Sequence, residues 1–104
     1  MSAVAAELEL PRELTLRQAS GTLARLRGAL ANPAAGAPVC VQAKGMEVFD
    51  SSALAVLLEL RRAAVADGRL FAVAGLPPAL RGLATLYGVE GLLTDAQAPA
   101  TPAG

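Results

Sequence analysis

The feature that most constrains this chain is a strand-like apolar run that leads, through a short loop, into a strongly apolar helix. Residues 39–41 (VCV) form the run, and the helix is predicted from about Ser52 to Ala66, where Asp67-Gly68 ends it. Leucine, valine and alanine cover most of the circumference of this helix. A helix of that kind is either deeply buried or covered by a partner.

The residues at the start of this helix admit two interpretations. Asp50, Ser51 and Ser52 stand there, and Asp and Ser are favoured N-cap residues because their side-chain oxygens accept hydrogen bonds from the unpaired N–H groups of the first turn. In the first interpretation both serines only cap. In the second, one hydroxyl is phosphorylated or contacts a partner, because the positive field of a helix N-terminus stabilises a phosphate or a partner's anion.

Two further helices are predicted. The first begins with the capping box of Thr15 and Gln18 and ends at Asn32-Pro33. Its apolar stripe recurs at steps of three and four and consists of Leu16, Ala19, Leu23, Leu26 and Leu30. The second begins at Pro77-Pro78 and ends at Gly88. Its inner face is expected to consist of Leu80, Leu83, Leu86 and Tyr87.

Predicted strands alternate with these helices. Residues 7–10 (ELEL) alternate polar and apolar side chains, Glu13-Leu14 is a short extended segment, and residues 70–74 (LFAVA) have the composition of a buried strand. Residues 89–93 are expected to form a short strand or a helical turn.

This order predicts one α/β domain over residues 1–95. Strands that alternate with helices pair in parallel through right-handed crossovers, so we expect about four or five strands and three or more helices, on one or both faces of the sheet. The hairpin-like start at residues 7–14 indicates a mixed sheet. The small, proline-containing residues 96–104 are expected to form a disordered tail.

The composition excludes several functions. Nine basic and nine acidic side chains give a net charge of zero without a basic patch, which argues against nucleic-acid binding. The chain has no histidine and one cysteine, so it lacks the commonest general base and a thiolate metal site. It has no phosphate-binding loop motif for ATP. We therefore expect a binding or regulatory module with no catalytic residues, cofactor or metal.

The expected location is the cytoplasm. One cysteine cannot form a disulfide within the chain, the first residues lack a positively charged leader, and no apolar run approaches the roughly 20 residues of a membrane span.

These features together resemble the STAS domain family over roughly residues 8–93. The family includes anti-sigma-factor antagonists and the small STAS subunit of the Mla phospholipid ABC transporter. Its signature is an Asp, then Ser or Thr, a small residue and Leu at the start of the helix after the central strand. Here Asp50, Ser51, Ser52 and Leu54 match it, and Ala53 stands where Gly is usual. The hydroxyl that is phosphorylated in the antagonists falls on Ser51.

The ending LATLYGVEGLL and the absence of any extension beyond the STAS core are more similar to the Mla subunit. The resemblance implies a non-enzymatic accessory subunit that binds and stabilises or activates the transporter's ATPase subunit, and so helps maintain the lipid asymmetry of the outer membrane. It would reach the inner membrane only through this partner. Ser51 and Tyr87 are the implied contact residues, together with Asp50, Ser52 and Leu54.

Two alternatives stay open. The first is a phosphorylation-switched anti-sigma-factor antagonist, in which Ser51 is the phosphoacceptor of a partner kinase. Gln42, which stands where that family often has Asp, and the nearby Lys44 weigh against phosphorylation. The second is a structural domain without a switch.

Overall fold

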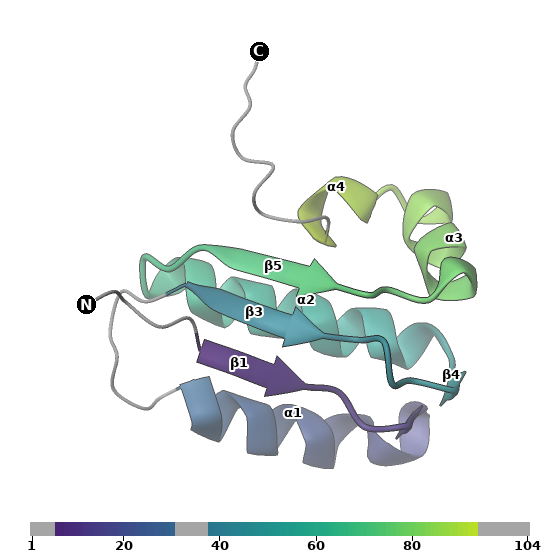
Figure 1. Cartoon of the computed structure of the whole chain (residues 1–104), viewed down its shortest axis with the longest axis horizontal. Helices are drawn as coiled ribbons and strands as arrows, with labels where there is room; N and C mark the ends of the chain where they lie inside the picture. Colours follow the sequence, from purple (N-terminus) through teal and green to yellow (C-terminus); the bar gives the residue numbers. More distant parts are fainter. Residues whose placement is uncertain (1–5, 31–37, 94–104) are drawn as a thin grey trace.

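The computed structural model describes residues 6–30 and 38–93. Within these residues it has five strands and four helices, which confirms the predicted α/β class (Figure 1). In chain order the elements are β1 (Ala6–Glu9), β2 (Glu13–Leu14), α1 (Leu16–Leu30), β3 (Val39–Gln42), β4 (Val48–Phe49), α2 (Ser51–Ala66), β5 (Phe71–Ala74), α3 (Pro78–Leu86) and α4 (Glu90–Leu93). The expected tail, residues 96–104, lies outside the described residues, as do residues 31–37.

The larger sheet has the strand order β1-β3-β5, and its neighbouring strands are parallel. Leu8, Val41 and Val73 lie side by side in this register and are buried. The connection from β1 to β3 contains α1, and the connection from β3 to β5 contains α2. Because both connections advance in the same direction across the sheet, right-handed crossovers place α1 and α2 on the same face. The two helices pack against each other along their length (Figure 1).

The prediction of a mixed sheet with a hairpin at its start is wrong for the described residues. The described strands pair only in parallel, and β1 and β2 do not form a hairpin because they belong to different sheets. After β1 the chain leaves the larger sheet, and the two residues of β2 pair with the two residues of β4. The carbonyl of Arg12 extends this small sheet by accepting hydrogen bonds from the N–H groups of Glu47 and Val48, at 2.8 and 3.0 Å.

The core lies between the larger sheet and the helices. From α2 alone it receives Ala53, Leu54, Val56, Leu57, Leu60 and Ala64. The wide apolar arc of this helix is therefore explained mainly by burial within the domain. Within the described part of the chain, no helix combines the length and the apolar character needed to cross a bilayer.

Three leucine or tyrosine side chains that we expected to face the core are exposed. Leu16, at 76% exposure, is the first residue of α1. Leu86, at 75%, projects from the side of α3 opposite the buried Leu80 and Ala84. Tyr87, at 57%, is the C-cap residue of α3, and the chain turns away at Gly88, whose φ is +74°.

A buried arginine connects α1 to the segment after α2. The side chain of Arg69 is buried, and its Nη1 donates a hydrogen bond to the carbonyl oxygen of Leu30 at 2.9 Å. Leu30 is the last residue of α1, where carbonyl groups have no partner within the helix. The Arg69 guanidinium therefore satisfies one of these carbonyls and also lies 3.9 Å from the carboxylate of Asp67.

Candidate functional site

The small sheet places the starts of α1 and α2 next to each other. Each of its strands has two residues and leads almost directly into a helix, β2 into α1 and β4 into α2. Leu14 is paired with Phe49, so the residues that follow them, Thr15 and Asp50, stand at the two helix starts side by side. Two helix N-termini, each with unpaired N–H groups and a partial positive charge, thus lie close together.

The carboxylate of Asp50 serves both helix starts. It is the N-cap residue of α2, and its Oδ1 accepts a hydrogen bond from the N–H of Ser52 at 2.8 Å. Its Oδ2 accepts a second one from the N–H of Leu16 in α1, at 3.2 Å. The hydrogen bond from the Ser52 backbone, more than any other contact, holds the pKa of Asp50 below its usual range, against an opposing effect of desolvation.

The start of α1 also carries the predicted capping box. Gln18 Oε1 accepts hydrogen bonds from the backbone N–H and the hydroxyl of Thr15, at 2.8 and 2.7 Å. The hydroxyl oxygen of Thr15 in turn accepts one from the N–H of Arg17 at 3.3 Å. The sequence signal for this helix start is therefore confirmed.

Ser51 is the first residue of α2 and is exposed. Its hydroxyl makes no hydrogen bond to any residue in the described ranges. Ser52 is half-buried and contributes its backbone N–H to Asp50. The interpretation in which both serines only cap is corrected, because Asp50 supplies the cap and leaves the Ser51 hydroxyl available to an external partner.

Two exposed apolar residues are connected to this helix start. Val48 is 48% exposed and stands two residues before Asp50 in the chain, and Leu16 is 76% exposed and donates its backbone N–H to Asp50. We call Leu16, Val48, Asp50 and Ser51 the helix-start surface. It combines a free hydroxyl, one carboxylate and two apolar side chains, which is a composition suited to contact with a protein.

Leu54 does not belong to this surface. Its side chain is 3% exposed and lies in the core, so the expectation that it contacts a partner is corrected. Leu54, the leucine of the signature, lies on the buried side of α2 and anchors the first turns of this helix in the core. Its role at the site is therefore to position the helix start.

Tyr87 is one of three exposed apolar residues in α3, α4 and the segment between them, and the other two are Leu86 and Leu92. We call these three residues the α3–α4 surface. Glu90 of α4 connects this helix to α3, since its carboxylate accepts hydrogen bonds from the hydroxyl of Thr85 at 2.8 Å and from Arg81 Nη1 at 3.4 Å. Among the described residues, no hydrogen bond joins Tyr87 to Asp50 or Ser51.

The two candidate sites, the helix-start surface and the α3–α4 surface, consist of exposed side chains. Within residues 6–30 and 38–93, no group of three or more His, Cys, Asp or Glu side chains is placed to hold a metal ion. The residues that sequence reasoning missed are Leu16 and Val48. The capping box and Asp50 each marked one helix start, but no local pattern showed that the two starts meet.

A protein-family model described as "Mlab, STAS domain" matches residues 1–94 of the chain. No curated protein and no solved structure matches the chain.

Proposed function

The chain belongs to the MlaB-like STAS domain family, and on this premise we propose that it is the accessory subunit that binds the ATPase of a Mla-type phospholipid ABC transporter. In this role it stabilises or activates the ATPase and so helps maintain the lipid asymmetry of the outer membrane. It works in the cytoplasm and reaches the inner membrane through the ATPase.

The observation that carries the proposal is the exposed Ser51 hydroxyl at a helix start already capped by Asp50. A hydroxyl that the fold does not use is available to donate or accept a hydrogen bond across an interface. The family description supports the choice of partner, because it names the Mla branch.

The helix-start surface supports a docking mechanism. Ser51 hydrogen-bonds to the ATPase, while Leu16 and Val48 are buried by the contact and contribute the apolar part of the binding free energy. Asp50 fixes both helix starts before the partner arrives, so little conformational entropy is lost there on binding. The bound subunit then favours the ATPase conformation to which it binds more tightly.

The exposure of Ser51 is also compatible with a second candidate function, that of an anti-sigma-factor antagonist in which Ser51 is the phosphoacceptor. A phosphate there would gain from the positive field of the α2 N-terminus. The Asp50 carboxylate already accepts the N–H of Ser52 and would repel the phosphate. These two effects oppose each other, and the choice of the docking role rests on the family description, which names the Mla branch.

Purification from native cells tests the proposal. The tagged chain should recover the transporter ATPase, and the complex should hydrolyse ATP faster than the ATPase alone. Recovery of an anti-sigma kinase in place of the ATPase would favour the second candidate. The chain alone should not hydrolyse ATP, and activity that persists in a highly purified sample would contradict the proposed role.

A further inference from the structure

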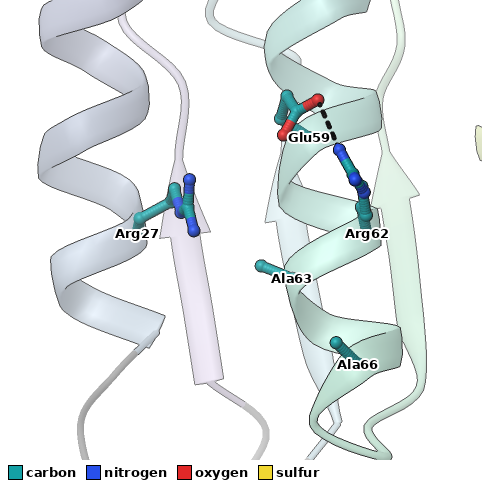
Figure 2. A pocket seen from close by; sticks show the side chains of 5 residues that line it. All are labelled: Arg27, Glu59, Arg62, Ala63 and Ala66. Carbon is teal, nitrogen blue, oxygen red and sulfur yellow. Dashed lines mark hydrogen bonds and ion pairs between the residues drawn. The ribbon is translucent and has the colours of Figure 1, made fainter.

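A shallow hollow of about 320 Å³ lies between α1 and α2, away from the helix-start surface. It is lined by Arg27, Glu59, Arg62, Ala63 and Ala66 (Figure 2). The two alanines carry only methyl groups, which leaves the space between the longer side chains open. The polar groups that border the hollow are therefore two guanidinium groups and one carboxylate.

The two arginines differ in their partners. Arg62 Nη1 lies 3.4 Å from Glu59 Oε2, an exposed and long ion pair within α2. Figure 2 shows Arg27 extending from α1 toward α2. Arg27 makes no hydrogen bond or ion pair with any part of the chain that the structure describes. Two positive charges thus border the hollow, and only one negative charge balances them.

The surrounding helices have the same bias. α1 contains three arginines and no acidic residue, and α2 contains two arginines and one glutamate. The chain as a whole has a net charge of zero, so its positive charge is concentrated on this helix pair. An anionic group is the ligand that such a surface attracts.

The hollow also lies on the same face of α2 as the candidate contact residue. Positions 51, 55, 59, 62 and 66 recur at steps of four and three, so Ser51, Glu59 and Arg62 share one face of the helix. At 1.5 Å per residue, Arg62 is roughly 16 Å from Ser51 along the axis. A protein that contacts Ser51 and lies along α2 therefore reaches the hollow.

We propose that the partner that docks at Ser51 also places one carboxylate side chain, from Asp or Glu, between Arg27 and Arg62. This inference rests on the proposed function and adds a second contact to it. The net charge of the three ionised groups at the hollow is positive by one, which matches a single carboxylate better than a doubly charged phosphate. Exposed arginines in an open hollow hold a free anion weakly, whereas a partner surface that excludes water strengthens the ion pairs.

The experiment measures the affinity of the ATPase for four forms of the full chain at low and at high salt. The forms are wild type, Ser51→Glu, the double variant Arg27→Gln with Arg62→Gln, and a control, Arg25→Gln, which removes an exposed arginine of α1 that does not line the hollow. We expect the double variant to bind roughly tenfold more weakly than wild type at low salt. Its affinity should also depend less on salt, because fewer ion pairs form. The control should bind like the wild type.

The outcomes separate the two proposals. If Ser51→Glu weakens binding while the double variant binds like wild type, the carboxylate contact is wrong and the proposed function stands. A wild-type chain that does not bind the ATPase contradicts both. Binding of the wild-type chain to vesicles of anionic phospholipid without ATPase, abolished in the double variant, would overturn the choice of a protein carboxylate as the occupant.

Discussion

The carboxylate of Asp50 lies 3.2 Å from the backbone nitrogen of Leu16, which is 34 residues earlier in the chain. The same carboxylate caps α2 through Ser52. The aspartate of the signature therefore has a structural task at two helix starts, and the serine beside it carries no such task. We therefore expect Asp50 to contribute to stability, and we propose Ser51 as the residue that contacts the partner.

Removal of the Asp50 carboxylate should destabilise the fold. We expect Asp50→Ala to lower the free energy of unfolding by more than its matched control does, because an N-cap is lost and the N–H of Leu16 loses its acceptor. Urea denaturation measures the change. The matched control is Glu47→Ala, which removes an exposed ion pair with Arg12 and should change stability by at most about 1 kcal/mol. Equal effects of both variants would contradict the structural role of Asp50.

Stability should also depend on pH through Asp50. Its pKa is lower in the folded chain than in the unfolded one, so its contribution is fully present above the ordinary aspartate pKa of about 3.9. The contribution is lost as pH falls from there through the lower pKa of the folded state. Urea midpoints measured between about pH 6 and pH 3 should therefore fall less steeply for Asp50→Asn than for wild type. Parallel curves would show that Asp50 does not titrate differently on folding.

The buried Arg69 should matter more than any exposed arginine. Arg69→Ala leaves the carbonyl of Leu30 without this donor and opens space in a buried position, so we expect a loss of about 2–4 kcal/mol in the free energy of unfolding. Arg62→Ala, which removes an exposed side chain, serves as control and should change stability by less than about 1 kcal/mol. Thermal and urea unfolding both report the difference. A stable Arg69→Ala variant would show that the hydrogen bond to Leu30 is dispensable.

The α3–α4 surface is a second place where the resemblance implies contact with the ATPase. Replacing the exposed side chains with Leu86→Ser and Tyr87→Ser should leave the unfolding free energy within about 0.5 kcal/mol of wild type. Binding to the ATPase should become weaker, because exposed apolar area is lost from the interface. Leu70→Ser, an exposed leucine just before β5, is the control. Unchanged binding in the double variant would remove Tyr87 from the contact residues.

Local patterns in the sequence predicted the local structure well. The capping box of Thr15 and Gln18, the apolar strands and the glycine after α3 each act over a few residues, and each appears where it was expected. The pairing of β2 with β4 could not be predicted, because strands of two residues show no periodicity and their partners are far apart in the chain. The contact between Asp50 and Leu16 depends on that pairing and was missed with it.

The affinity of the transporter ATPase for wild type, Ser51→Ala and Ser51→Glu tests the central claim most directly. Because Asp50 provides the cap, both variants should fold with a stability within about 1 kcal/mol of wild type. We predict that Ser51→Ala weakens ATPase binding and that Ser51→Glu, which adds bulk and charge at the contact, weakens it further. Equal affinity of all three folded forms would contradict the claim that the exposed Ser51 hydroxyl is the docking contact.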